Sequence, residues 1–455
     1  MFNKNEINLI SDDTNYLTNE DIFILKRGKN YKIDQILKEA KNKNPKLIIS
    51  NYHHKDVYYV KNINKYEKKI IKEYNVNPTI IGVTGTNGKT STSTIIYSVL
   101  KKLNKKVMLI GSNGIYFNDF KLPTRNTTPS KLTILYLINK YLDNNSYLII
   151  ELSSQSYSRI KSLHVDYLIF TNLSKEHLDT HKTMKRYFKA KIKIINLLKN
   201  KENLFINIDD NYGKKLLKKY KIAQTYSFKD INIISNNPIK FIFNNYKVTS
   251  KLSGNFNIYN ILSSILVVNK IFTNLESIIE SIKDIEVIEG RNNVYNYKNN
   301  KIIIDYAHTP YSFENIISHY YHLKFNSIYI LFGFGGNKDI SKRSEMIQVS
   351  LKYSNNIILT EDNSRNEKFI NIIKSALKDE FDNLIIIQDR KEAIRYAISK
   401  LSDNDCLLIL GKGNENYMLK NKEFIEYSDY GEVKKCNIYN CIINICLFYS
   451  SILYY

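Results

Sequence analysis

Residues 84–90 read Thr-Gly-Thr-Asn-Gly-Lys-Thr, and this stretch decides the fold. It follows the apolar run 79–83 and precedes a stretch, 91–103, that has the length and pattern of an amphipathic helix. A glycine-containing loop between a buried strand and a helix lets backbone N–H groups approach phosphates, whose charge a lysine then neutralises. Val83 stands where the general P-loop pattern has its first glycine. The stretch therefore predicts a nucleoside triphosphate site at the end of a sheet strand.

Other short apolar runs recur along the chain, each bounded by polar or turn residues. They lie at 147–150, 167–170, 301–304, 328–332, 356–359, 384–387 and 406–410. Helix-length amphipathic stretches such as 369–378 separate several of them. Strands that alternate with helices build parallel sheets of the α/β class, and ligands of such sheets bind beyond the carboxyl ends of the strands. We therefore expect an α/β protein whose chemistry lies in the loops that follow these runs.

Length and charge narrow the class of protein. The 455 residues suggest about three domains, which we place at 1–76, 77–289 and 290–437, followed by an apolar tail at 438–455. The formal net charge is +23, but lysines are spread along the whole chain, which favours an anionic nucleotide substrate over a nucleic-acid partner.

The cysteines form no Cys-x-x-Cys pair and the N-terminus lacks an apolar signal region, so we expect a cytoplasmic protein. We favour a packed or functionless tail over a membrane anchor.

Further motifs follow the glycine loop along the chain. They are Asn-Thr-Thr-Pro-Ser at 126–130, Glu-Leu-Ser-Ser at 151–154, Thr-Asn-Leu-Ser-Lys-Glu-His-Leu-Asp at 171–179, Tyr-Phe-Lys-Ala-Lys at 187–191, Gly-Asn-Phe-Asn-Ile-Tyr-Asn at 254–260 and Asp-Asn-Ser-Arg at 362–365. Together with Gly-Thr-Asn-Gly-Lys-Thr, they resemble the motifs of the Mur ligases over nearly the whole chain. The resemblance implies a central P-loop ATPase-type parallel sheet, a C-terminal Rossmann-like sheet and a small N-terminal α/β domain.

The resemblance also implies where ATP and magnesium bind. The implied magnesium ligands are Thr90, Glu151, His177 and an N-carbamoylated Lys191. Carbamoylation converts a lysine cation into an oxygen ligand of the kind that Mg²⁺ prefers. Lys89, Glu151, His177 and Lys191 form the implied catalytic set. The implied ATP-binding residues are Gly85, Thr86, Asn87, Gly88, Lys89, Thr90, Ser91, Asn257, Asn260, Arg291, Asp305 and His308.

Two further residue sets would bind the substrates that these family members join. UDP-N-acetylmuramoyl-L-alanyl-D-glutamate would contact Thr14, Asn126, Thr127, Thr128, Ser153, Arg159 and Lys161. The incoming amino acid would contact Arg343, Asp362, Asn363, Ser364, Arg365, Gly411 and Glu415. The resemblance thus implies a monomeric, ATP-dependent amide-bond ligase that works through an acyl phosphate.

The identity of the added amino acid depends on Arg365. Asp-Asn-Ser-Arg resembles the Asp-Asn-Pro-Arg signature of the members that add meso-diaminopimelate. A guanidinium binds the extra carboxylate of that amino acid through two N–H donors, whereas it repels the side-chain ammonium of lysine. We therefore expect meso-diaminopimelate as the partner substrate.

Several positions depart from the family pattern. Asp13-Thr14-Asn15 replaces Asp-Ser-Arg, Lys161 replaces an arginine, Ser364 replaces the signature proline and Asn414 replaces a histidine. The alternatives that stay open are the same ligation with L-lysine, another Mur-type or folylpolyglutamate-type ligase, and an inactive nucleotide-binding relative. A P-loop protein that moves along nucleic acid is disfavoured, because the sequence holds no helicase-type motifs.

Overall fold

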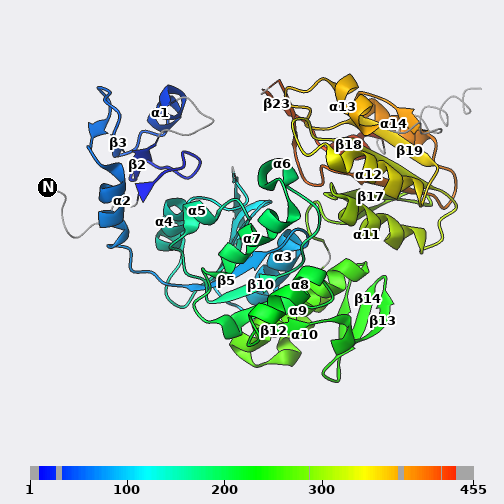
Figure 1. Cartoon of the computed structure of the whole chain (residues 1–455), viewed down its shortest axis with the longest axis horizontal. Coiled ribbons are helices and arrows are strands. Elements are labelled where there is room, and N and C mark those ends of the chain that lie inside the picture. Colours follow the sequence, from blue (N-terminus) through cyan, green and yellow to red (C-terminus); the bar gives the residue numbers. More distant parts are fainter. Residues whose placement is uncertain are drawn as a thin grey trace, which may run out of the picture. The chain divides into compact units, whose positions relative to one another are not determined.

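The computed structural model describes residues 10–26, 33–124, 126–285, 287–377, 384–421 and 423–436. The chain divides into two compact units, whose helices and strands are labelled in Figure 1. The first consists of Met1–Leu173, Phe188–Asp230 and Asn260–Ile282, and the second of Ser174–Tyr187, Ile231–Tyr259 and Lys283–Tyr455. The domains 1–76, 77–289 and 290–437 remain a prediction, and the tail 438–455 lies outside the described residues. Within the described residues, no helix has both the length and the apolar character that a membrane span requires.

A small parallel sheet with the strand order β1-β2-β3-β4 opens the first unit. Its elements are β1 (Ile10–Ser11), β2 (Ile22–Leu25), α1 (Ile33–Lys41), β3 (Leu47–Ser50), β4 (Tyr58–Tyr59) and α2 (Ile63–Ile71). Successive strand residues face opposite sides of a sheet. Ile24 accordingly shares a core with Ile63 of α2, while Phe23 shares another core with Leu37 of α1. The two helices therefore cover opposite faces of this sheet.

An eight-stranded sheet with the order β12-β11-β10-β5-β9-β6-β7-β8 forms the rest of the first unit's framework. Neighbours from β12 to β6 are parallel, and β7 and β8 extend the edge as antiparallel strands. The strands are β5 (Thr79–Thr84), β6 (Val107–Gly111), β7 (Gly114–Phe117), β8 (Phe120–Leu122), β9 (Tyr147–Glu151), β10 (Tyr167–Phe170), β11 (Leu204–Asn207) and β12 (Gln224–Tyr226). The predicted strands 79–83, 147–150 and 167–170 are confirmed as β5, β9 and β10.

Helices connect the strands of this sheet. They are α3 (Lys89–Lys102), α4 (Lys131–Tyr141), α5 (Tyr157–Ile160), α7 (Met184–Ile195) and α8 (Asn211–Lys219), with a short 3₁₀ turn at Lys201–Asn203. Later in the chain than β12 come a 3₁₀ turn at Phe228–Asp230 and the helices α9 (Asn255–Phe272) and α10 (Leu275–Lys283). The predicted helix 91–103 is confirmed as α3, which begins two residues earlier, at Lys89. The strand–loop–helix context of the glycine loop is therefore the one that the sequence predicts.

The second unit contains a three-stranded, a six-stranded and a two-stranded sheet. The six-stranded sheet has the order β16-β17-β21-β18-β19-β20 and is parallel except for β16. The strands are β13 (Asn232–Asn236), β14 (Ile239–Phe243), β15 (Tyr246–Ser250), β16 (Asn293–Tyr297), β17 (Asn300–Asp305), β18 (Ile328–Phe334), β19 (Asn356–Glu361), β20 (Leu384–Ile386), β21 (Cys406–Leu410), β22 (Tyr417–Lys420) and β23 (Glu423–Glu426). The helices are α6 (Leu178–His181), α11 (Pro310–Tyr321), α12 (Ser341–Leu351), α13 (Phe369–Ala376) and α14 (Arg390–Ser399).

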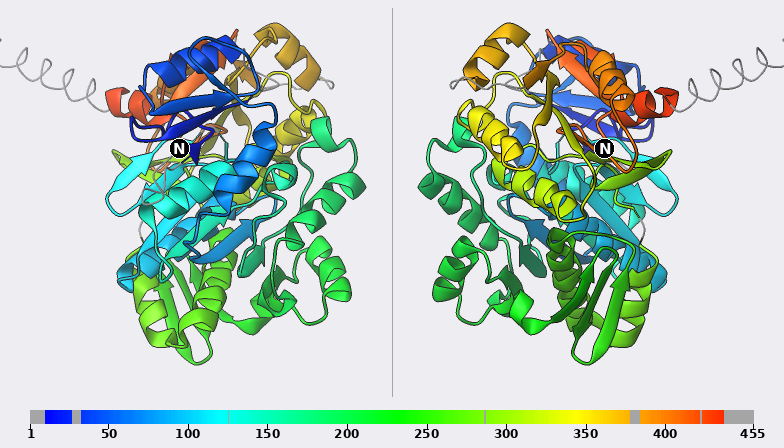
Figure 2. Two further views of the ribbon diagram at one scale, coloured as in Figure 1. Left: turned by 90° about the vertical axis from the view of Figure 1, so that its left-hand side faces the viewer. Right: turned by 90° about the vertical axis from the view of Figure 1, so that its right-hand side faces the viewer.

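Helices cover both faces of the six-stranded sheet (Figure 2). Residues of α11, α12 and α13 share one core with Ile303, while residues of α14 share the other with Ile304. The parallel strands β17, β18, β19 and β21 end at the same edge, so the loops that follow them converge there. The predicted parallel α/β class is thereby confirmed.

Candidate active site

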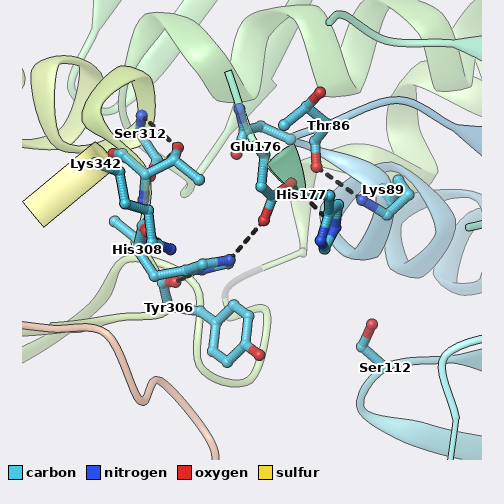
Figure 3. A network of polar contacts seen from close by, with 12 residues as sticks. Thr86, Lys89, Ser112, Glu176, His177, Tyr306, His308, Ser312 and Lys342 are labelled. Atoms are coloured by element: carbon cyan, nitrogen blue, oxygen red, sulfur yellow. Dashed lines mark hydrogen bonds and ion pairs between the residues drawn. The ribbon is translucent and has the colours of Figure 1, made fainter. Parts of the chain in front are cut away.

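The glycine loop joins β5 to α3 and is shaped by two glycines. Gly88 caps α3 with a φ of 82°, and a Cβ there would lie 2.6 Å from Asn260 Oδ1. A Cβ on Gly85, whose φ is 150°, would lie 1.9 Å from Thr171 Oγ1. The Lys89 ammonium donates to the carbonyl oxygens of Thr86 at 2.7 Å and Gly85 at 3.0 Å (Figure 3). The loop thus has the close backbone packing that a phosphate site requires.

Residues of the motif 171–179 hold this loop in place. Thr86 N donates to Asn172 O at 2.9 Å, and Asn87 N donates to Asn172 Oδ1 at 3.0 Å. Thr171 Oγ1 donates to Asn87 O at 2.6 Å. The sequence predicts the motif but gives no role to these two residues, which position the loop.

Glu151 lies at the end of β9 with its carboxylate fixed by the end of β6. Ser112 donates twice, from its N–H to Oε1 at 3.0 Å and from its hydroxyl to Oε2 at 3.0 Å. A Cβ on Gly111 would lie 2.1 Å from Glu151 Oε1, so only glycine leaves room for the carboxylate. Sequence reasoning missed both residues, although glycine and polar residues directly after an apolar run are the signal that marks the other loops of the site.

Several predicted contacts of the UDP-linked peptide lie beside Glu151. The Thr127 hydroxyl is 3.0 Å from the Ser112 hydroxyl, and Thr128 Oγ1 donates to Glu151 O at 2.7 Å. Ser153 N donates to Thr128 Oγ1 at 3.0 Å, and Arg159 donates to Thr128 O at 3.2 Å. Residues 127–128, Ser153 and Arg159 therefore form one hydrogen-bonded group.

The other residues predicted for this substrate lie less close together. Asn126 and Lys161 are exposed. Thr14 is buried in the N-terminal part of the chain and donates to Glu39 Oε2 at 2.9 Å. Its loop docks on α4, because Asp12 Oδ1 accepts hydrogen bonds from Ser130 and Thr133 at 2.7 Å each.

Lys191 extends from α7 to the glycine loop. Its side chain is 2% exposed, and its ammonium donates to Gly85 O at 2.5 Å. Lys189 and Lys193, the neighbouring lysines of the same helix, are exposed. Burial thus singles out Lys191 among the three as the residue that reaches the loop.

In the second unit, Glu176 lies between two histidines (Figure 3). Its Oε1 is 2.8 Å from His308 Nε2, and its Oε2 is 3.4 Å from His177 Nε2. The other ring nitrogen of His308 is 2.8 Å from Tyr306 O, and Lys342 donates to His308 O at 2.7 Å. The buried Glu176, a residue without a predicted role, therefore orients both predicted histidines.

The remaining predicted ATP residues of the second unit lie around Asp305. Asp305 accepts hydrogen bonds from Asn292 N and Ala307 N, each at 2.6 Å. Burial raises the pKa of the Asp305 carboxyl, and nearby Arg291 opposes that rise. The Arg291 guanidinium lies 4.3 Å from the centre of the Tyr306 ring. Asn257 is also buried in this unit, whereas Asn260 and the loop residues Thr90 and Ser91 belong to the first unit.

The predicted amino-acid loop, 362–365, begins after β19. Asp362, Asn363 and Ser364 are buried, whereas Arg365 is half-buried with a φ of 55°. Arg365 NH1 donates to Gly336 O at 3.0 Å and Asn363 O at 3.2 Å. Arg365 N donates to Leu419 O at 2.9 Å, which ties the loop to the β22–β23 hairpin. The hairpin thus holds the backbone of Arg365, while the carbonyl oxygens of Gly336 and Asn363 hold its guanidinium.

The loop after β21 contacts this amino-acid loop. A Cβ on Gly411, whose φ is 110°, would lie 3.3 Å from Asp362 Oδ2. Glu415 Oε2 accepts from Asn363 Nδ2 at 2.8 Å. It also accepts from Lys412 Nζ at 3.0 Å, although the sequence reasoning assigns Lys412 no role. The structure therefore brings Asp362, Asn363, Gly411 and Glu415 together.

Arg343 has a different environment. Its side chain is 1% exposed, and its guanidinium donates to Glu367 at 2.8 and 2.9 Å and to Gly335 O at 3.3 Å. These contacts brace the glycine loop after β18. A contact between Arg343 and the incoming amino acid remains a prediction.

The donors of the first unit suit a magnesium ion that is shared with phosphates. Within the described residues, no group of three or more His, Cys, Asp or Glu side chains could hold a metal by itself. Thr90 and Glu151 offer a hydroxyl and a carboxylate, and Mg²⁺ in phosphoryl-transfer sites takes few protein oxygens besides those of the substrate. The residues present therefore fit Mg²⁺ bound together with a nucleotide.

Comparison with known proteins gives consistent matches along the chain. The Mur ligase middle domain matches residues 83–268, and the Mur ligase glutamate ligase domain matches residues 290–413. A Clostridium botulinum protein named UDP-N-acetylmuramoyl-L-alanyl-D-glutamate--2,6-diaminopimelate ligase is 33% identical over 458 residues, which cover 94% of each chain. A Buchnera aphidicola protein of the same name is 33% identical over 446 residues, covering 91% of this chain and 87% of that protein.

Solved structures share the fold. A structure of a ligase with that name has a TM-score of 0.57 and 24% identity, covering 95% of each chain. The MurF ligase from Thermotoga maritima in complex with ADP has a TM-score of 0.67 and 18% identity, covering 89% of this chain and 94% of that one.

Proposed function

This chain belongs to the Mur ligase family, and we propose that it joins meso-diaminopimelate to UDP-N-acetylmuramoyl-L-alanyl-D-glutamate with the energy of ATP. The observation that carries the proposal is the loop 84–90. The ammonium of the buried Lys191 donates a hydrogen bond to this loop, at Gly85 O. A loop of this kind binds a nucleotide, and the surrounding motifs are those of amide-bond ligases. The product is a precursor for peptidoglycan synthesis.

The reaction proceeds in two steps. The terminal carboxylate of the UDP-linked peptide attacks the γ-phosphorus of ATP, so that ADP leaves and an acyl phosphate forms. The amine of diaminopimelate then attacks the acyl carbon, and the tetrahedral intermediate expels phosphate while the nitrogen loses a proton. Lys89 would exchange its carbonyl partners for β- and γ-phosphate oxygens and stabilise the transferring group. No enzyme nucleophile is required.

We assign magnesium to Thr90, Glu151, His177 and carbamoylated Lys191. Bound there, Mg²⁺ would neutralise charge on the transferring phosphoryl group. Ser112 and Gly111 would hold the Glu151 carboxylate in the orientation that binds the ion. Carbamoylation would replace the Lys191 ammonium, which repels a cation, with an oxygen ligand.

The two substrates are assigned to three separate parts of the chain. We assign the UDP end of the peptide substrate to the predicted domain 1–76 and its peptide end to Thr127, Thr128, Ser153 and Arg159. We assign the incoming amino acid to the loops that follow β19 and β21. There Arg365 would bind the distal carboxylate of diaminopimelate, and Glu415 would bind the distal ammonium.

One assay tests this function. Purified protein is incubated with ATP, Mg²⁺ and UDP-N-acetylmuramoyl-L-alanyl-D-glutamate, and phosphate release is compared between meso-diaminopimelate and L-lysine. We expect release that depends on meso-diaminopimelate. Release with neither amino acid would refute the ligase assignment, and a preference for lysine would refute the assignment of Arg365.

A further inference from the structure

Lys412 places a charged group in the interior of the second unit. Its side chain is 0% exposed, and the residue lies two positions after the end of β21. The ammonium has acceptors at Glu415 Oε2 at 3.0 Å, Asn363 Oδ1 at 3.3 Å and Asp362 Oδ1 at 3.5 Å. A buried ammonium loses its hydration, so it is retained only where such acceptors compensate for that loss. All of its acceptors belong to the amino-acid set.

These contacts fix the orientation of both partner side chains. Asn363 Oδ1 accepts from Lys412 and from Leu419 N at 2.8 Å, so Asn363 Nδ2 faces Glu415 Oε2 at 2.8 Å. Glu415 Oε2 therefore accepts from both Lys412 and Asn363. Within the part of the chain that the structure describes, the Tyr306 hydroxyl is the partner of Oε1, at 3.5 Å, and this oxygen has capacity for a further donor.

The charges of this cluster suit an amino acid with a zwitterionic end. The buried Asp362 carboxylate and the half-buried Glu415 carboxylate would repel each other without a cation between them. Burial would raise the pKa of the Asp362 carboxyl, but Lys412 and Arg390 hold it below its usual value. Glu415 can thus receive an ammonium while Arg365, on the same loop as Asp362, receives a carboxylate.

We propose that Lys412 is a positioning residue for amino-acid selection, which holds Glu415 and Asn363 in the orientation that receives the distal ammonium of the incoming diamino acid. This inference rests on the proposed function. Lys412 contacts no reacting atom, so its replacement should affect amino-acid binding and leave phosphoryl transfer unchanged.

The test compares Lys412→Met with wild-type enzyme for each substrate in turn. We expect the KM for meso-diaminopimelate to rise about tenfold or more, because Glu415 loses its charge-assisted partner. The KM values for ATP and the UDP-linked peptide should stay within about twofold, because their contacts lie elsewhere. Lys352→Met is the matched control, since Lys352 pairs with Glu314 outside the cluster and is 60% exposed. It should change none of these constants.

A second variant separates a loss of folding from a loss of amino-acid binding. Lys412→Met combined with Glu415→Gln removes a charge of each sign, so we expect its melting temperature to recover while the KM for meso-diaminopimelate stays high. A folded Lys412→Met enzyme with an unchanged KM for meso-diaminopimelate, or one whose three KM values rise together, would overturn the inference. Wild-type enzyme that is inactive with every amino acid would instead overturn the proposed function, and this inference with it.

Discussion

Selectivity between two similar amino acids depends on single side chains. Arg365 is half-buried, with NH1 bonded to the carbonyl oxygen of Asn363 in its own loop and to that of Gly336 in the loop after β18. We expect Arg365→Ala to raise the KM for meso-diaminopimelate by about 10- to 100-fold, since a charge-assisted bond is worth roughly 1.5–3 kcal/mol. Competition between meso-diaminopimelate and L-lysine in one reaction measures the change. Arg365→Lys should recover little, because an ammonium lacks the two-donor geometry, and unchanged selectivity in the alanine variant would refute this role.

His319 of α11 should make the protein sensitive to acid. It is buried beside Phe256 and, among the described residues, its Nε2 has no hydrogen-bond partner. Burial, aided by His322, lowers its pKa from 6.5 to about 4. Between those values the unfolded chain binds the proton and the folded chain does not, so stability is present above pH 6.5 and falls as the pH drops toward 4.

Replacing His319 should therefore reduce the loss of folding stability at acid pH. We expect His319→Phe to lose less stability than wild type between about pH 7 and pH 4.5, by up to about 3 kcal/mol. Urea unfolding at both pH values measures the difference. The exposed His164 provides the control variant His164→Gln, which should follow the wild type. Parallel pH curves for wild type and His319→Phe would contradict the prediction.

Residue roles could be predicted where the chemistry resides in the residue type itself. Glu151, Lys191 and Arg365 carry charges that follow recognisable motifs, and their positions are consistent with the roles proposed. Ser112 and Lys412 could not be assigned because the partner of Ser112, Glu151, and two partners of Lys412, Asp362 and Asn363, lie far away in sequence. Their roles are visible only once strands β6, β9 and β21 are placed.

At the scale of elements, the start of α3 depends on one glycine. Gly88 has a φ of 82° and would bring a Cβ within 2.6 Å of Asn260 Oδ1. We expect Gly88→Ala to weaken ATP binding by about tenfold or more, since the left-handed conformation alone costs roughly 1–2 kcal/mol for alanine. Calorimetric titration with a non-hydrolysable ATP analogue measures this. Gly431→Ala, where the nearest atom to a Cβ is 3.5 Å away, is the control. Equal affinity in the two variants would contradict the prediction.

The junction of β6 and β9 offers a second element-scale prediction. Alanine at Gly111 would place a Cβ 2.1 Å from Glu151 Oε1, so the carboxylate must move. We expect Gly111→Ala to lower kcat by about 10- to 100-fold and to raise the Mg²⁺ concentration needed for half-maximal activity. Titration with Mg²⁺ at saturating ATP checks this. Ser112→Ala removes one of two hydrogen bonds to the carboxylate and should have a smaller effect. An unchanged Mg²⁺ requirement in Gly111→Ala would count against Glu151 as a ligand.

Elements could be predicted where strands are buried on both faces. The continuous apolar runs gave β5, β9, β10, β17, β18, β19, β20 and β21, and all of these pair in parallel. The antiparallel β13–β15 sheet and the β22–β23 hairpin were not predicted. Their strands are partly exposed and mixed with polar residues, so they lack the apolar signal.

At the scale of the whole molecule, the family prediction is confirmed by matches to the Mur ligase middle domain at residues 83–268 and to the glutamate ligase domain at residues 290–413. The boundaries 1–76, 77–289 and 290–437 remain a prediction. Compact units arise from contacts across the chain, and segments such as Ser174–Tyr187 and Ile231–Tyr259 cluster with residues far away in sequence. Local sequence patterns do not predict such long-range contacts.

We propose that this chain forms its amide bond through an acyl phosphate of the UDP-linked peptide. UDP-N-acetylmuramoyl-L-alanyl-D-glutamate labelled with ¹⁸O in its terminal carboxylate is incubated with the protein, ATP, Mg²⁺ and meso-diaminopimelate, and the released phosphate is examined by mass spectrometry. An acyl-phosphate route predicts one labelled oxygen in each phosphate and an equal amount of amide product. Unlabelled phosphate, or phosphate released without amide, would contradict it.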